Sequence, residues 1–272
     1  MYFEELEPFG ALKPYIRSYF HVQSDSKDAK SFSFPSDGCP GMLINLGDPV
    51  LFGTNLLNLR PLSGCDVFGY LSRSFFLQSL KPNQIEIIAI KFLPGSLEPI
   101  FGIKSAELAD SIVSIDDLWS KKGQELTDRI YSSNSVPDTI ELLDVAFTKR
   151  LSETTSTTNR LHRALDEIIR LKGQIRIEDL ADQAGISRRQ IERTFNDNVG
   201  ITPKRFCRIV RFGNILPQLK SINSTNWANL ALSAGYCDQA HFINDWKFFT
   251  GRSPLAYLNG ISTLEATIMG IL

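Results

Sequence analysis

An internal repeat near the C-terminus constrains the fold of this chain more than any other sequence feature. The segment "LADQAGISRRQIERTFNDNVGITPKRF" at 180–206 aligns with "LALSAGYCDQAHFINDWKFFTGRSPLAY" at 230–257, with one inserted residue in the second segment. The matched positions are Leu180, Ala181, Ala184, Gly185, Ser187, Ile191, Phe195, Gly200, Pro203 and Phe206, and then Leu230, Ala231, Ala234, Gly235, Asp238, Phe242, Trp246, Gly251, Pro254 and Tyr257. Two copies of one pattern predict two similar units in tandem.

Each copy predicts a short helix, a tight turn and a second helix. The first helix ends at a glycine, Gly185 or Gly235, and a capping residue, Ser187 or Asp238, starts the next one. This pattern is a helix-turn-helix, and we expect the two units at about 177–198 and 227–250. Large side chains four residues apart in the second helix of each unit should face inward. In the second unit we expect the core to contain Tyr236, Phe242, Trp246, Phe248, Phe249 and Tyr257.

The opposite face of each second helix carries side chains that suit a DNA major groove. In the first unit these are Arg188, Arg189, Glu192, Arg193 and Asn196, and in the second Gln239, Ala240, Ile243, Asn244 and Lys247. Arginine pairs with guanine, asparagine and glutamine pair with adenine, and small apolar groups touch the thymine methyl. A face that is merely solvated is the alternative. Two such faces in a basic segment favour DNA.

The charge distribution supports an anionic partner for this segment. Residues 159–258 contain 15 Lys and Arg against 9 Asp and Glu, a net charge of +6. The rest of the chain contains 14 and 21, a net charge of -7, within an overall charge of -1. Ordinary surface charge would also give such a balance, so this count alone does not decide the function.

Residues from about 160 to 258 resemble the DNA-binding domain of the AraC/XylS family of transcription regulators. The motifs are "LA..AGIS...IERTF....GITPKRF" and "LALSAGY.D.AHF...WK..TGRSPLAY", which end in the G-x-S-P turn of the family signature. The resemblance implies double-stranded DNA as the partner and a role in transcription regulation, with RNA polymerase as a further partner. It implies base contacts from Arg189, Glu192, Arg193, Gln239, Ala240, Ile243 and Asn244, and a phosphate contact from Lys247.

The chain departs from the family pattern at the second helix and between the two units. Asn244 stands where the family usually has arginine, and Trp246 stands where phenylalanine is commoner. Base reading at Asn244 is therefore expected either to be weaker or to shift towards adenine. The connecting segment "PKRFCRIVRFGNILPQLKS" contains Gly213 and Pro217. Proline within a helix removes a hydrogen bond and bends the axis, so we expect the helix to be disturbed there.

The N-terminal part predicts a different kind of domain. Strand-like runs such as "GMLINLGDP" and "NQIEIIAIKFLPGS" alternate with turn signals, which is typical of a small antiparallel barrel or sandwich. Through "INLGDP" and "KFLPGSLEPIFGIKSAELADSIVSIDDLW" it resembles the cupin-like sensory domains of such regulators. We therefore expect an α+β chain, with a β-rich cupin-like barrel at 1–120, a helical connector at 121–158 and an all-α domain at 159–260. The polar segment 152–159 is the expected hinge.

A barrel of this size can hold one small-molecule effector. Its only histidine is His21, too few ligands for a histidine-based metal site, and no phosphate-binding or hydrolase motif occurs. Cys39, in "DGCPGM", is either a nucleophile or a turn cysteine, and no neighbouring basic residue would lower its pKa. We expect no cofactor and no enzymatic activity.

Two alternatives remain open for the N-terminal domain. The N-terminal domain could be an enzyme fused to the DNA-binding part, or it could bind no ligand and only form a homodimer.

The acidic N-terminus "MYFEELEPFG" is unlike a signal peptide, and charges interrupt the longest apolar run. We expect a soluble cytoplasmic protein that does not enter a membrane. The cysteines Cys39, Cys65, Cys207 and Cys237 should be free thiols.

Overall fold

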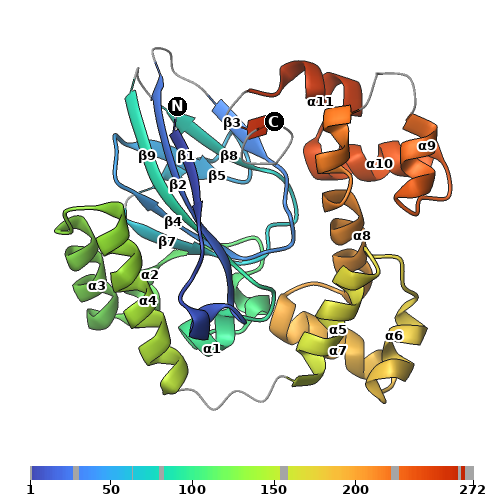
Figure 1. Cartoon of the computed structure of the whole chain (residues 1–272), viewed down its shortest axis with the longest axis horizontal. Coiled ribbons are helices and arrows are strands. Elements are labelled where there is room, and N and C mark those ends of the chain that lie inside the picture. The colour runs from blue at the N-terminus through green and yellow to red at the C-terminus, as the bar shows by residue number, and fades with distance from the viewer. Residues whose placement is uncertain are drawn as a thin grey trace.

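The computed structural model describes residues 2–26, 31–62, 64–79, 83–153, 159–221, 227–262 and 265–266 of the chain (Figure 1). The strands are β1 (Tyr2–Leu6), β2 (Ile16–Ser26), β3 (Ser31–Phe34), β4 (Gly41–Asn45), β5 (Val50–Gly53), β6 (Arg60–Pro61), β7 (Cys65–Phe68), β8 (Phe75–Ser79), β9 (Asn83–Phe92) and β10 (Ile112–Ser114). The α-helices are α1 (Leu97–Phe101), α2 (Ile115–Trp119), α3 (Lys121–Tyr131), α4 (Val136–Ser152), α5 (Asn159–Arg170), α6 (Ile177–Ala184), α7 (Arg188–Val199), α8 (Pro203–Gly213), α9 (Trp227–Ser233), α10 (Gln239–Thr250) and α11 (Pro254–Gly260). Three 3-10 helices are η1 (Gly10–Leu12), η2 (Ser105–Leu108) and η3 (Leu216–Ser221).

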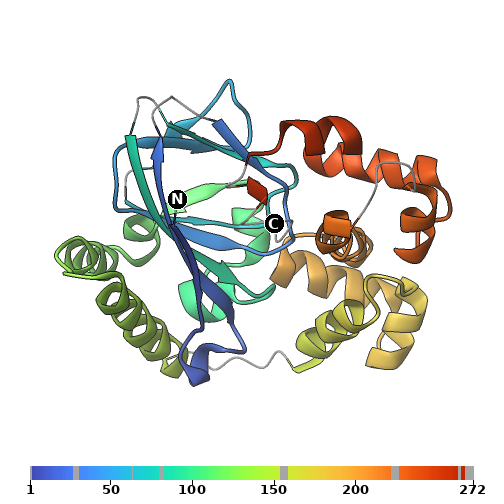
Figure 2. The ribbon, with the colours of Figure 1, turned by 45° about the horizontal axis from the view of Figure 1, so that its top comes forward.

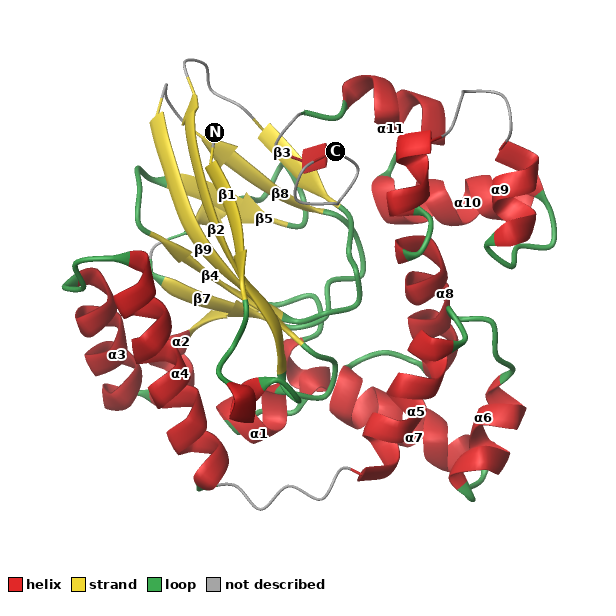
Figure 3. Ribbon diagram, in the orientation of Figure 1, coloured by secondary structure: helices red, strands yellow, loops and turns green. Residues whose placement is uncertain are grey.

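All the strands lie in one half of the molecule, and helices α5–α11 form the other half (Figure 3). The strands form two antiparallel sheets, one in the order β1-β2-β9-β4-β7-β10 and one in the order β3-β8-β5-β6. The α+β class with two kinds of domain is therefore confirmed. The expected barrel closure is not, because each sheet is open and ends in edge strands. Barrel closure depends on pairing between strands that are far apart in the sequence, and local sequence patterns do not encode such pairing.

The central strands are buried on both faces, which explains their nearly continuous apolar runs. On β4, Leu43 belongs to the core between the two sheets, whereas Met42 and Ile44 belong to the core on the other face. On β9, Ile87 and Ile88 divide in the same way. Side chains alternate along a strand, so a strand with partners on both sides needs apolar residues at every position.

Helices α3 and α4 cover the outer face of the larger sheet (Figure 2). Phe147 of α4 is fully buried, and its ring lies 5.7 Å from that of Phe92 on β9. Leu126 of α3 and Leu143 of α4 are buried in the same core. The predicted connector at 121–158 is therefore helical, but its helices pack as part of the β-rich half rather than as a free link. Residues 154–158 of the predicted hinge lie outside the described residues.

The helical half is organised around α8 and a core of aromatic side chains. Trp246 is fully buried, with its ring 5.2 Å from Phe212 of α8, 5.6 Å from Phe242 and 5.7 Å from Tyr257. Helix α8 ends at Gly213, before Pro217, which lies in the separate helix η3. Pro217 therefore does not bend the linking helix as predicted, because that helix has already stopped.

Candidate nucleic-acid interface

The first helix-turn-helix forms where the sequence predicted it. Gly185 ends α6 in the left-handed conformation, with φ +64°, and Ser187 starts α7. The Ser187 hydroxyl accepts a hydrogen bond from the Gln190 backbone N–H, and the Gln190 side chain accepts one from the Ser187 N–H. This reciprocal cap satisfies two donors at the helix N-terminus and fixes where α7 begins. Ile191 and Phe195 are buried, as expected.

Among the described residues, the arginines on the outward face of α7 differ in whether they form ion pairs. Arg189 and Arg193 are exposed, and no ion pair is found for them among the described residues. Arg188 is held by two carboxylates, since its Nη1 donates to Glu178 at 2.6 Å and its Nε donates to Glu192 at 3.0 Å. Exposed pairs of this kind contribute little stability. They do hold the Arg188 guanidinium and the half-buried Glu192 beside the helix N-terminus.

The second helix-turn-helix repeats this construction with different side chains. Gly235 has φ +80°, and the Asp238 carboxylate caps α10 by accepting from the His241 N–H at 2.7 Å. Phe242, Trp246 and Phe249 point inward and are fully buried. The opposite face exposes Gln239, Ala240, Asn244 and Lys247, with Ile243 half-buried at its edge against the core.

The prediction that Phe248 belongs to the aromatic core is wrong. Its side chain is 41% exposed. The guanidinium of Arg208 lies 4.8 Å from the centre of its ring, and that of Arg205 lies 5.3 Å from it. Phe248 is two positions from the buried Trp246 on the same helix, so its side chain turns away from the centre of the core, and arginines of α8 cover its ring.

Sequence reasoning missed an ion pair that joins the second unit to the linking helix α8. Asp245 is buried, and its Oδ1 accepts hydrogen bonds from Nη2 of Arg208 at 2.7 Å and from Nε at 3.1 Å. Burial raises the pKa of the nearby Tyr236 phenol, and the charge of Asp245 raises it further. An acidic residue between two inward positions of α10, Phe242 and Trp246, was the available signal, since a buried carboxylate requires a partner.

The β-rich half contains an apolar cavity of about 70 Å³ between the two sheets. Its lining residues are Val22, Phe32, Phe34, Leu43, Val50, Phe75, Leu77, Gln78, Ser79, Ile85, Ile87 and Ala89. Gln78 and Ser79 are the polar residues of this lining, which contains no ionisable side chain. Its walls suit an apolar ligand.

The candidate nucleophile Cys39 is in an unfavourable environment. Burial raises the pKa of its thiol to about 12, and the charge of Asp37 adds to this effect. The thiolate is the reactive form of cysteine, so this environment favours a structural role. His21 lies 3.0 Å from the Glu86 carboxylate. The described residues contain no group of three or more His, Cys, Asp and Glu side chains arranged to hold a metal ion.

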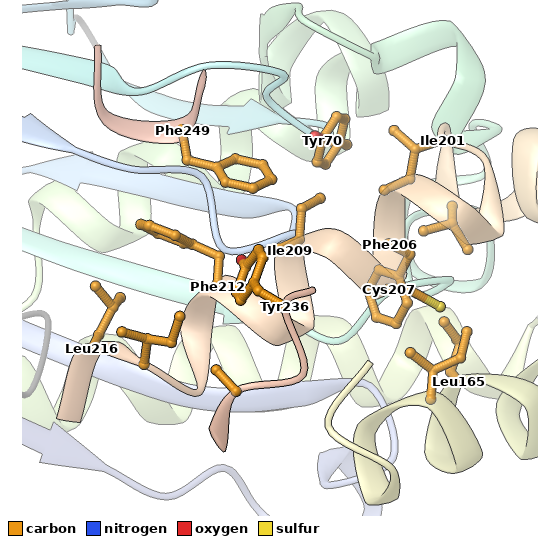
Figure 4. Close-up of a cluster of buried hydrophobic side chains, with 14 of the residues drawn as sticks. Tyr70, Leu165, Ile201, Phe206, Cys207, Ile209, Phe212, Leu216, Tyr236 and Phe249 are labelled. Atoms are coloured by element: carbon orange, nitrogen blue, oxygen red, sulfur yellow. The ribbon is translucent and has the colours of Figure 1, made fainter. Parts of the chain in front are cut away.

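The two halves meet around α8 (Figure 4). Tyr70 precedes β8 in the β-rich half, yet it is 1% exposed and belongs to the core of the helical half. On the opposite side of the contact, Phe206 and Ile209 of α8 face Gly38, whose added Cβ would lie 3.0 Å from Ile209. Ser74 also crosses this contact, because its Oγ donates to the backbone oxygen of Phe249 at 2.7 Å.

In the part of the chain that the structure describes, no helix is both long and apolar enough to cross a membrane.

Comparison with protein families gives a match in each half. Residues 180–260 match a family described as a helix-turn-helix domain, and residues 4–114 match a domain of unknown function (DUF6597). An uncharacterized HTH-type transcriptional regulator of Haemophilus influenzae is 34% identical to this chain over 104 residues. That match covers 38% of this chain and 35% of the relative, so the similarity spans about a third of the relative's length.

Comparison with solved structures extends over most of the chain. The apo ToxT K231A structure from Vibrio cholerae aligns with 12% identity and a TM-score of 0.50, covering 90% of this chain and 98% of ToxT. Wild-type ToxT with bound unsaturated fatty acid, also from Vibrio cholerae, aligns with 12% identity, a TM-score of 0.49 and coverage of 90% and 96%. At this identity the similarity concerns the fold alone.

Proposed function

We propose that this chain is an AraC-type helix-turn-helix transcription regulator in which α7 and α10 read DNA while an apolar small molecule bound between the two sheets controls the reading. One observation carries the proposal. Two capped helices, α7 and α10, bury one face in a common core and expose the other face with groove-reading side chains. A protein that needed these helices only for its core would have no requirement for the same construction twice.

We assign the reading of bases to both helices. Arg189 and Arg193 present planar forks that match guanine, and Glu192 can accept from the amino group of cytosine. In α10 the corresponding surface is formed by Gln239, Ala240, Ile243 and Asn244. Gln239 and Asn244 match adenine, whereas Ala240 and Ile243 match the thymine methyl. Lys247 and Arg188, as cationic side chains on these faces, are assigned to the phosphates.

The cavity between the sheets supports control by an apolar effector. Filling an apolar cavity with an apolar ligand is favourable, and this cavity offers no partner for a buried charge. The strands that line it also contact the helical half. On β3, Phe32 and Phe34 line the cavity, while the N–H of Ser33 between them donates to the carboxylate of Glu265. Phe75, the first residue of β8, also lines the cavity, and the preceding residue, Ser74, donates a hydrogen bond to α10.

An enzymatic N-terminal domain is the weaker candidate. General acid–base or nucleophilic chemistry needs a titratable or nucleophilic group within reach of the substrate. The described residues that line the cavity offer the amide of Gln78 and the hydroxyl of Ser79. That lining contains no titratable side chain. A ligand-independent domain that only forms a homodimer remains the other candidate, and light scattering would give its oligomeric state.

Binding of the full-length protein to DNA tests the first part of the proposal. We expect selection from a random duplex library to yield a defined site with two conserved blocks, one for each helix. The affinity for that site should exceed the affinity for scrambled DNA by at least 10³-fold at physiological salt. Equal affinity for both duplexes would reject the regulator function. Binding of RNA polymerase at the selected promoter is a separate prediction, tested by transcription in vitro.

Thermal unfolding with apolar probes tests the second part. Naphthalene and 1-decanol should raise the melting temperature of the wild type, because a ligand that binds only the folded state stabilises it. Ala89→Phe would place a ring in the cavity and should remove this effect. Ala146→Phe on α4, outside the cavity, is the control and should keep the response. The assignment would be contradicted if neither probe raised the melting temperature of the wild type, or if the rise were no larger than in Ala89→Phe.

A further inference from the structure

The C-terminal end of α7 is fitted against η2 of the β-rich half. Ser105 is buried, and its Oγ donates a hydrogen bond of 2.5 Å to the backbone oxygen of Asn198. Gly200 ends α7 with φ +83°, and a Cβ added there would lie 2.8 Å from the carbonyl oxygen of Ser105. The two backbones therefore approach so closely that glycine is required twice, for its conformation and for its lack of a side chain.

The C-terminal end of α10 is held in a similar way by the segment before β8. Ser74 is buried, and its Oγ donates to the backbone oxygen of Phe249. Arg205 of α8 extends this contact, since its guanidinium lies 5.4 Å from the ring centre of Tyr70 and its Nη2 donates to the backbone oxygen of Ser72 at 3.3 Å. The last turn of an α-helix has free carbonyl groups, so hydroxyl donors can fix its position.

The two contacting segments are bonded to each other. The N–H of Asp110 donates to the backbone oxygen of Tyr70 at 2.8 Å, and its carboxylate accepts from the N–H of Ser72 at 2.5 Å. Asp110 has φ +55°, an unfavourable conformation for a residue other than glycine, which persists where surrounding contacts determine it. We call these joined segments, residues 70–74 and 105–110, the platform.

We propose that the platform fixes the distance between α7 and α10, and that Ser74 and Ser105 are positioning residues that determine which spacing of two DNA half-sites the protein reads. The inference rests on the proposed function, because it takes α7 and α10 as the readers. Each added base pair moves a half-site by about 3.4 Å and rotates it around the helix, of which one turn is about 34 Å. A rigid pair of readers fits one spacing, whereas a loosened pair fits several.

The competing possibility is that α8 alone sets the spacing. Helix α8 contacts both units, and the Arg208–Asp245 pair and the Phe212–Trp246 ring contact hold α10 on it. If that were sufficient, removal of the platform contacts would leave the preferred spacing unchanged. The same experiment therefore separates the two possibilities.

A spacer series with the full-length protein tests the inference. Duplexes carry the two selected half-sites with the spacing changed by -2 to +2 base pairs, and the dissociation constant is measured for each. We expect the wild type to prefer one spacing by at least tenfold. In Ser74→Ala/Ser105→Ala that preference should fall at least fivefold, while the affinity for each single half-site stays within twofold. Ser132→Ala, at an exposed serine after α3, is the control and should keep the wild-type profile.

The outcomes are distinct. An unchanged spacing profile in the double variant overturns the inference, and so does a wild type that binds all spacings equally. A wild type that selects no half-sites at all contradicts the proposed function instead. If the double variant is unfolded at the assay temperature, Ser74→Ala and Ser105→Ala are measured singly. Each should then flatten the profile about twofold, and two unchanged profiles overturn the inference.

Discussion

Asp245 and Arg208 form a bidentate ion pair between the second recognition helix and the helix that links the two units. Asp245→Asn should lower the free energy of unfolding by about 1.5–3 kcal/mol, because a buried, charge-assisted hydrogen bond is lost and Arg208 keeps its charge. Denaturant unfolding would measure this. Asp197→Asn, at an exposed position of α7, is the control and should stay within about 0.5 kcal/mol of the wild type. Equal stability of the two variants would mean that the pair contributes nothing.

Substitutions of Trp246 and Asn244, which lie two positions apart on α10, should have different effects on stability and DNA binding. Trp246→Ala removes a fully buried ring and should cost about 3–5 kcal/mol of stability. Asn244→Ala, at an exposed position, should change stability by no more than about 0.5 kcal/mol. It should instead alter the preference at one A·T pair. Melting curves and site selection on both variants check this, and unchanged selectivity in Asn244→Ala would remove this residue from the readers.

Arg193 offers a test of base reading in α7. Arg193→Ala should weaken binding to the preferred site by about 1–3 kcal/mol and relax selectivity at one base pair. Arg129→Ala, an exposed arginine on α3, is the matched control and should bind as the wild type does. Weakening of equal size on every sequence would instead identify Arg193 as a phosphate contact.

Salt dependence tests the phosphate contacts. The logarithm of the association constant should fall linearly with the logarithm of the salt concentration, because each neutralised phosphate releases counterions. Lys247→Ala should reduce the magnitude of this slope by about 1 and weaken binding to all sequences alike. Lys149→Ala, an exposed lysine on α4, should leave the slope unchanged. A slope near zero for the wild type would exclude phosphate contacts as a source of affinity.

Three thiols with raised pKa values predict loss of stability at alkaline pH. Burial raises the pKa of Cys39 and of Cys65 to about 12 and that of Cys207 to about 11. A thiol in the unfolded chain has a pKa of about 8.5, so between this pH and about pH 11–12 the folded state binds more protons than the unfolded state does. Stability is therefore fully present below about pH 8.5 and declines as the pH rises through this window. Urea unfolding from pH 7 to pH 11 checks this, and a flat profile would contradict it.

Alkylation at pH 8 gives an independent reading of the same thiols. The exposed Cys237 should react with iodoacetamide in the native protein, whereas the buried Cys65 and Cys207 and the protonated Cys39 should react mainly after unfolding. Mass spectrometry of the labelled peptides identifies the modified residues. Preferential labelling of Cys39 in the native protein would reopen its assignment as a nucleophile.

The sequence by itself determined the two helix-turn-helix units, because their signals are local. A capping serine or aspartate bonds an N–H three residues away, and a glycine in the left-handed conformation ends a helix without distant partners. The spacing of Phe242 and Trp246 likewise decided which face of α10 is buried. The chemistry of both exposed faces followed from the same spacing.

Tertiary structure alone decided how these units are held and what accompanies them. The openness of the two sheets depends on pairings such as β2 with β9, whose paired residues run from Ser26 with Asn83 to Ile16 with Phe92, 57 to 76 positions apart. The Arg208–Asp245 pair, the place of Tyr70 in the helical core and the bonds from Ser74 and Ser105 join residues separated by 37 to 175 positions. No local propensity encodes such contacts, because their free energy is gained only after the intervening chain has folded.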